Sequence, residues 1–183
     1  MPKVLVPLAQ GCEELEAVTI IDLLRRAEID VVTAGLNSKT VTASRGVKLM
    51  PDTDLDTALK DDYDMVVLPG GRDGAENLDN DPRILKLLNK IADSGKFTAA
   101  ICAAPTVLGN AGLLEGKKAT SYPGFLEKLK LANTEISGDP VVRDGTVITS
   151  RGPGTAMDFA LALIEILDGK EKRDQVESAL ARS

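Results

Sequence analysis

Short, continuous apolar runs alternate along the chain with longer segments of helical spacing. The short runs are rich in β-branched residues and end at glycine, proline or polar residues, which predicts strands buried on both faces. The longer segments carry apolar residues every three or four positions, which predicts amphipathic helices. The predicted strands are 3–9, 29–36, 64–68, 97–101 and 117–121, with short strands at 40–43 and 46–50 after a polar turn at 37–39, and a hairpin at 141–149 around Asp144-Gly145. The predicted helices are 13–27, 81–93, 103–111, 155–167 and 171–181, with shorter pieces at 54–59 and 125–129.

Strands that alternate with helices of this length imply βαβ units, a mostly parallel sheet and helices on both of its faces. No internal repeat, low-complexity tract or linker interrupts the pattern, so we expect residues 1–183 to form one domain. In such folds, functional sites gather beyond the carboxyl ends of the strands. Gly11, the Pro69-Gly70-Gly71 turn and Cys102 each follow a predicted strand and are therefore candidate site positions.

The composition removes several classes of function. The chain of 183 residues has no histidine, which excludes Ser-His-Asp and Cys-His triads and histidine-ligated metals. Its cysteines, Cys12 and Cys102, are too few for a zinc ribbon or a disulfide scaffold, so no metal is expected. The net charge of −6 argues against a nucleic-acid partner. No apolar run is long enough for a membrane helix or a signal peptide, which predicts a cytoplasmic protein with reduced thiols and no membrane partner.

Cys102 lies between an apolar strand and a helix rich in small residues. A side chain on such a strand-to-helix turn projects from the sheet, usually on strained backbone, and the following helix N-terminus favours a thiolate. This position favours a nucleophile, and the alternative is a buried structural cysteine. Cys12 follows the first strand, so it is either a resolving thiol near Cys102 or a small buried residue.

Glu16 begins the apolar stripe of the first predicted helix, which continues with Ile20, Leu23, Leu24 and Ala27. A carboxyl group on this face points toward the core, where burial raises its pKa and the neutral form can donate a hydrogen bond to a thiolate. The alternative is a first-turn glutamate that the helix dipole favours.

Backbone N–H groups and arginines supply the remaining candidates. The N–H groups of the Gly70-Gly71 turn and of Ala103 can form an oxyanion hole, and the alternative for the glycines is a tight turn. Arg26 and Arg45 are candidates for holding a carboxylate or phosphate, although most arginines only solvate a surface.

Five motifs together are more specific than any one of them. In order, they are Gly11-Cys12-Glu13-Glu14-Leu15-Glu16, Ser44-Arg45-Gly46, Val67-Leu68-Pro69-Gly70-Gly71, Ala99-Ala100-Ile101-Cys102-Ala103-Ala104-Pro105 and Thr149-Ser150-Arg151-Gly152-Pro153-Gly154-Thr155. The chain resembles the ThiJ/PfpI superfamily from residue 3 to about residue 180, and it looks closest to the DJ-one branch, that of the Parkinsonism-associated protein deglycase. The resemblance implies a flavodoxin-like three-layer α/β sandwich, usually assembled as a homodimer.

The resemblance also implies roles for individual residues. Cys102 takes the place of the elbow cysteine, and Glu16 takes that of the carboxyl group beside its sulfur. Gly71 and Ala103 take the places of the backbone N–H donors. The activities implied are cofactor-free conversion of reactive α-oxoaldehydes such as methylglyoxal, deglycation of their adducts, oxidative-stress sensing and chaperoning.

The same resemblance places Arg26 and Arg45 near a pocket at the dimer edge, with Arg45 reaching the partner's site. The chain departs from the family at two positions. Tyr122 occupies a position near the cysteine where many members have histidine, and a tyrosine with a pKa near 10 is a poor base at neutral pH. Cys12 replaces a residue that is usually small and unreactive.

Two hypotheses follow from these residues. In the first, the Cys102 thiolate attacks an aldehyde to give a hemithioacetal, Glu16 moves the proton, and Arg26, Arg45 and Tyr122 contact the substrate. In the second, the protein is a redox sensor or chaperone that acts through oxidation of Cys102, with a Cys12–Cys102 disulfide as a variant.

Overall fold

The computed structural model describes residues 1–37 and 39–183, so Ser38, in the turn predicted at 37–39, lies outside the described residues. Most predicted elements are present, with ends that differ by a few residues. The strands are β1 (Lys3–Leu8), β2 (Asp30–Gly35), β3 (Val41–Thr42), β4 (Lys48–Leu49), β5 (Thr53–Asp54), β6 (Met65–Leu68), β7 (Phe97–Ile101), β8 (Lys118–Ala119), β9 (Glu135–Ile136), β10 (Val141–Asp144) and β11 (Val147–Ser150). The helices are α1 (Glu14–Arg26), α2 (Leu55–Ala58), α3 (Arg72–Asp79), α4 (Pro82–Asp93), α5 (Pro105–Asn110), α6 (Phe125–Lys128) and α7 (Ala156–Ala179), with a short 3₁₀ helix at Pro153–Thr155.

Seven of the described strands form one central sheet in the order β10-β11-β7-β6-β1-β2-β5. Neighbouring strands run parallel except β10 and β11, which form the antiparallel hairpin predicted around Asp144-Gly145. The hairpin of β3 and β4 lies beside the end of β1, where the Gly11 N–H donates to the Thr42 carbonyl at 2.9 Å. This contact brings the tip of the hairpin to the carboxyl edge of the sheet.

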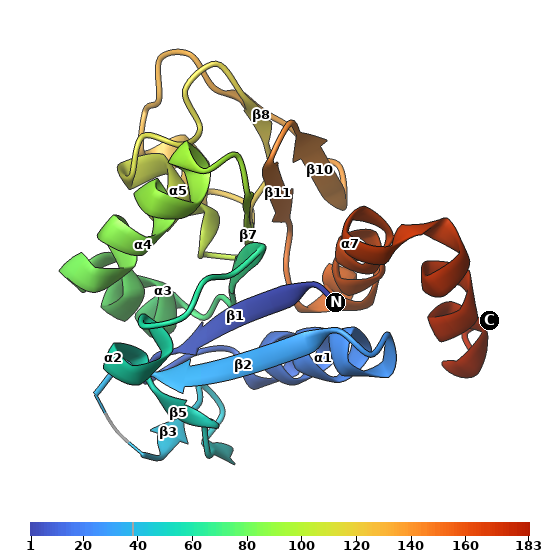
Figure 1. Cartoon of the computed structure of the whole chain (residues 1–183). Helices are drawn as coiled ribbons and strands as arrows, with labels where there is room; N and C mark the ends of the chain where they lie inside the picture. The colour runs from blue at the N-terminus through green and yellow to red at the C-terminus, as the bar shows by residue number, and fades with distance from the viewer. Residues whose placement is uncertain (38) are drawn as a thin grey trace.

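Helices cover both faces of the sheet, with α1 and α7 on one side and α3, α4 and α5 on the other (Figure 1). Alternate residues of β1 enter two separate apolar cores, because side chains along a strand point to opposite faces. Val4 and Val6 pack in the core of α1 and α7, whereas Leu5 packs in the other. The predicted three-layer, mostly parallel α/β sandwich of flavodoxin-like type is therefore confirmed. That residues 1–183 form a single domain stays a prediction.

Helix α1 begins as its sequence predicts. The carboxylate of Glu13 caps it by accepting the Glu16 N–H at 2.8 Å, which satisfies one of the free donors of the first turn. The buried stripe of the helix contains Glu16, Ile20, Leu23 and Leu24, which confirms the predicted face. The cap and the buried stripe together place the Glu16 carboxyl group in the core.

Several elements were not predicted. Helix α3 starts directly after the Gly70-Gly71 turn, and its mean composition is polar, but Ala75 and Leu78 bury one side of it. Strands β5 and β9, of two residues each, were also missed. The two predicted C-terminal helices correspond to α7, which is broken at Gly169, where φ is 89°. Among the described residues, no helix is both long and apolar enough to cross a membrane.

Candidate active site

Cys102 lies at the carboxyl end of β7 on strained backbone. Its φ of 65° is in the left-handed region, which residues with a Cβ rarely adopt. Two backbone hydrogen bonds hold this conformation, because the Cys102 N–H donates to the Ser150 carbonyl of β11 at 3.0 Å and the Cys102 carbonyl accepts the Tyr122 N–H at 2.8 Å. The residue is 9% exposed. The sulfur is thus aimed off the end of the sheet at a point that solvent just reaches.

Glu16 and Cys102 converge on Gly70. A Cβ added to Gly70 would lie 2.6 Å from Cys102 Cβ and 2.7 Å from Glu16 Oε1, so only glycine fits between them. Glu16 is fully buried, and its Oε1 accepts the Gly70 N–H at 3.0 Å. Its Oε2 has no hydrogen-bond partner among the described residues, and the Cys102 thiol is the side chain whose hydrogen bonding acts to lower the pKa of the carboxyl group.

The carboxyl and thiol groups compete for protons in this buried setting. Burial raises the pKa of Glu16 to about 7, against the opposing hydrogen bonds of Cys102 and Gly70. Burial and the Glu16 charge raise the pKa of the Cys102 thiol to about 12, and the N–H groups of Gly71 and Ala103 act to lower it. Because the Glu16 charge is one cause of the high thiol pKa, protonation of the carboxyl group removes one of the effects that oppose a thiolate.

Burial thus opposes the thiolate that the sequence predicts at the start of the following helix, and a reactive thiolate at Cys102 stays a prediction. Helix α5 begins only at Pro105 and is short, with six residues. Its dipole acts over one turn, so it offsets little of the desolvation that burial imposes on a thiolate.

A cavity of about 510 Å³ opens above Cys102. Five of the other positions predicted from the sequence line it, namely Gly11, Gly71, Ala103, Arg45 and Tyr122. Glu16, being fully buried, is not among the lining residues. The remaining lining residues are Glu13, Ser44, Arg72, Asp73, Phe125 and Pro153. The structure thus brings most of the candidates to one place.

Arg45 and Tyr122 line the same cavity, although they come from different parts of the fold. Arg45 stands at the tip of the β3–β4 hairpin and lines the cavity of its own chain, and its reach into a partner's site stays a prediction. Tyr122 is 47% exposed, and its ring meets Phe125 edge-on with centroids 6.1 Å apart. Tyr122 thus forms a wall of the cavity beside Cys102.

The structure does not bring Arg26 or Cys12 to this cavity. Arg26 lies in the last turn of α1, about 15 Å along the helix axis from Glu16, and forms an ion pair with Asp22. Cys12 is 1% exposed, and burial is the main cause that raises the pKa of its thiol to about 12. Both cysteines are free in the structure.

Several residues at the cavity were not predicted from the sequence, because the sequence patterns that could have indicated them were weak. Arg72 and Asp73 follow the Gly70-Gly71 turn directly, so a helix predicted at this point would have placed them at the site. Glu14 was named only as a member of the first motif and was given no role, yet its carboxylate accepts hydrogen bonds from Ser44 and Arg45. Only the fold joins those positions, since the hairpin is distant from α1 in the sequence.

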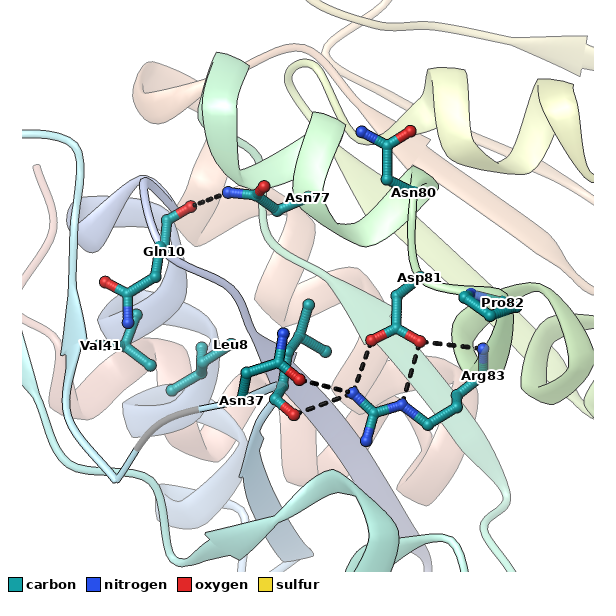
Figure 2. Close-up of a pocket in the computed structure, with 10 residues that line it drawn as sticks. Leu8, Gln10, Asn37, Val41, Asn77, Asn80, Asp81, Pro82 and Arg83 are labelled. Carbon is teal, nitrogen blue, oxygen red and sulfur yellow. Dashed lines mark hydrogen bonds and ion pairs between the residues drawn. The ribbon is translucent and has the colours of Figure 1, made fainter.

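A larger cavity, of about 630 Å³, lies at the ends of β1 and β2 (Figure 2). Its polar groups satisfy one another. The Arg83 guanidinium donates to Asp81 at 2.6 Å and to the Leu36 carbonyl at 2.9 Å, and the Asn77 amide donates to the Gln10 carbonyl at 2.9 Å. Because these groups are already paired and none of the described residues that line this cavity is a nucleophile, the smaller cavity at Cys102 is the better candidate site. Within residues 1–37 and 39–183, no cluster of acidic, cysteine or histidine side chains is placed to hold a metal ion.

The chain matches the model of the DJ-1/PfpI family over residues 2–166. It is 48% identical over 180 residues to Protein DJ-1 homolog B of Arabidopsis thaliana, which covers 97% of this chain but 41% of that protein, so the chain spans less than half of this relative's length. It is 34% identical over 167 residues to the glutathione-independent glyoxalase DJR-1.2 of Caenorhabditis elegans, which covers 91% of this chain and 89% of that protein. The crystal structure of Drosophila melanogaster DJ-1beta superposes with a TM-score of 0.95 at 45% identity, covering 100% of this chain and 98% of that one.

Proposed function

The chain belongs to the DJ-1/PfpI family, and on that premise we propose that it is a cysteine-dependent enzyme that converts reactive α-oxoaldehydes such as methylglyoxal, or their adducts, without a cofactor. One observation carries the proposal. The Cys102 thiol, on a strained turn, adjoins a carboxyl group with a pKa of about 7 and opens on a cavity large enough for a small carbonyl compound. The relative from Caenorhabditis elegans named as a glyoxalase supports it.

The first proposed step is addition. The Cys102 sulfur forms a bond to the aldehyde carbon while its proton passes to the Glu16 carboxylate. The carbonyl oxygen gains the negative charge, and the N–H groups of Gly71 and Ala103, which already act on the sulfur, are the donors beside it. Return of the proton to this oxygen completes a hemithioacetal.

The second proposed step is an isomerisation that needs no oxidant. Glu16 removes the proton from the former aldehyde carbon and, through an enediol, delivers a proton to the neighbouring carbon. The product is a thioester of lactate on Cys102, and water then releases lactate and restores the thiol. A carboxyl group with a pKa of about 7 suits both halves of this transfer, because it is protonated and ionised in comparable amounts at neutral pH. Arg45, at the mouth, is the group that we propose to attract the developing carboxylate.

The test compares methylglyoxal consumption and lactate formation in three proteins. The Cys102→Ser variant is expected to lose at least about a hundredfold in turnover, because a neutral hydroxyl is a far weaker nucleophile. The Cys12→Ala variant also loses a thiol, but one that does not reach the cavity, and is expected to retain turnover. Wild-type rates in the Cys102→Ser protein would overturn the proposal.

A second candidate function is redox sensing through Cys102, with chaperone activity as its output. The observation that favours it is the set of donors around the sulfur, since the Gly71 and Ala103 N–H groups and a protonated Glu16 would all stabilise a sulfinate. Intact mass after mild peroxide separates the outcomes. A gain of two oxygens on Cys102 supports sensing, loss of two hydrogens indicates a disulfide with Cys12, and no change removes this candidate.

We also propose a homodimer. Leu15 and Val18, one turn apart on α1, are 50% and 47% exposed, and Val47 on the nearby hairpin is 48% exposed. Apolar side chains grouped in this way commonly mark an interface. Light scattering coupled to size-exclusion chromatography measures the mass directly, and a monomer at micromolar concentration would contradict the proposal.

A further inference from the structure

The carboxylate of Glu14 is committed to one turn of the neighbouring hairpin. Glu14 is the first residue of α1 and is 9% exposed. Its Oε2 accepts the Ser44 hydroxyl at 2.9 Å, and its Oε1 accepts the Arg45 N–H at 2.8 Å. Both oxygens therefore serve consecutive residues at the tip of the β3–β4 hairpin.

The turn itself is closed by backbone hydrogen bonds. The Gly46 N–H donates to the Ala43 carbonyl at 3.0 Å, and the Ala43 N–H donates to the Val47 carbonyl at 2.8 Å. These bonds shape the tip but do not join it to α1. Glu14 makes that connection, and its carboxylate stays ionised, because hydrogen bonds that include those from Ser44 and Arg45 hold its pKa below the ordinary value despite burial.

The cavity does not attract anions by its overall charge. Arg45 and Arg72 line it, but so do Glu13 and Asp73, and the four formal charges cancel. Among the described residues, the Arg45 guanidinium has no ion pair or hydrogen bond of its own that would fix its direction. Its placement at the mouth therefore depends on where the backbone of the turn is held.

We propose that Glu14 is a positioning residue that holds the Ser44–Arg45 turn so that the Arg45 guanidinium faces the cavity and favours carbonyl compounds bearing an anionic group near the reacting carbon. This inference rests on the proposed function for its substrate, and it assigns Glu14 no contact with the substrate. It predicts that the charge of a reagent affects the rate at which it reacts with Cys102, even when no catalytic turnover takes place.

Alkylation of Cys102 by iodoacetate and by iodoacetamide tests the proposal, because the two reagents differ chiefly in charge. The ratio of the two rates, followed by mass spectrometry of the Cys102 peptide, reports the preference for an anion. Arg45→Ala is expected to lower this ratio by up to about fivefold, the usual limit for a partly exposed charge pair. Glu14→Ala is expected to lower it by a similar factor, although loss of a nearby negative charge alone would raise it.

Two further variants separate positioning from general damage. Glu14→Gln is expected to restore the ratio, because its amide oxygen can accept the Arg45 N–H and its NH₂ group can donate to Ser44. In the Arg45→Ala background, Glu14→Ala is expected not to lower the ratio any further, since the group that it positions is gone and the lost negative charge acts only to raise the ratio. Glu76→Gln, which changes the charge of an exposed residue of α3, is the control and should leave the ratio unchanged.

An unchanged ratio in folded Glu14→Ala protein, or additive effects of the two alanine substitutions, would overturn the proposal. If Glu14→Ala does not fold, Ser44→Ala removes a single hydrogen bond to the same carboxylate and should lower the ratio by a smaller factor. The alkylation ratio does not require catalysis. A protein that shows these changes but never consumes methylglyoxal would therefore refute the proposed function and leave this inference standing.

Discussion

Replacing Glu16 by glutamine is expected to change how the stability of the protein depends on pH. In the unfolded chain, the Glu16 carboxyl group loses its proton near the ordinary pKa of 4.5, whereas burial in the folded chain raises this pKa to about 7. Between these two pH values the folded state binds one more proton than the unfolded state, so the free energy of unfolding falls as pH rises. Between these two pH values, the free energy of unfolding falls by about 1.4 kcal/mol for each pH unit, and by about 3 kcal/mol in all.

The glutamine variant mimics the neutral form of the carboxyl group, and its amide does not gain or lose a proton across this pH range. Its amide oxygen can still accept the Gly70 N–H that Glu16 accepts at 3.0 Å. We therefore expect the two proteins to have similar stability at pH 4.5, and Glu16→Gln to be the more stable by about 3 kcal/mol at pH 8. The Cys102 thiol, with its pKa raised to about 12, stays protonated across this window and adds no slope of its own.

Urea denaturation at half-unit intervals from pH 4.5 to 8 measures this difference. Other titrating groups affect both proteins alike, so the difference between the two curves isolates Glu16. A difference that stays constant across the window would refute the argument that burial keeps this carboxyl group protonated. A difference that grows in the opposite direction would show that the ionised form is the one that the fold stabilises.

Two further predictions concern the cysteines. Cys102→Gly is expected to be more stable than Cys102→Ala by about 1 kcal/mol, because the φ of 65° strains any residue with a Cβ, and equal melting temperatures in the two variants would contradict it. Cys12 is expected to resist iodoacetamide in the native protein, since it is 1% exposed with a raised pKa, and to react after denaturation. Peptide mapping under both conditions measures this, and rapid native labelling of Cys12 would contradict it.

Patterns of short range allowed the sheet and the larger helices to be predicted. The β-branched runs at β1, β2 and β7 and the apolar stripe of α1 are set by residues that lie close together in the sequence. The residues alone indicated that Glu16 begins a buried stripe and that Cys102 ends a buried strand, whereas their juxtaposition was implied by the family resemblance. Both signals depend on a periodicity that a single chain displays.

Features that depend on distant contacts were not accessible in the same way. Helix α3 forms from a polar segment with a glycine inside it, because Ala75 and Leu78 pack on the sheet. The distance of Arg26 from the cavity follows from the length of α1, which no motif encodes. The burial of Cys102, which opposes the thiolate that the following helix favours, also results from contacts between segments distant in the sequence.

Glu14 and Glu16 show how local surroundings divide one chemical group into two roles. They lie two residues apart on α1, and both are buried, yet their pKa values move in opposite directions. Glu14 receives hydrogen bonds from Ser44 and Arg45 that stabilise its charge, so it can anchor a turn but cannot hold a proton at neutral pH. Glu16 receives one backbone N–H and faces a thiol, so it can take and return a proton there. If this division is correct, substitutions at Glu16 should alter the pH profile of Cys102 reactivity, whereas substitutions at Glu14 should leave that profile unchanged and alter the preference of Cys102 for anionic reagents.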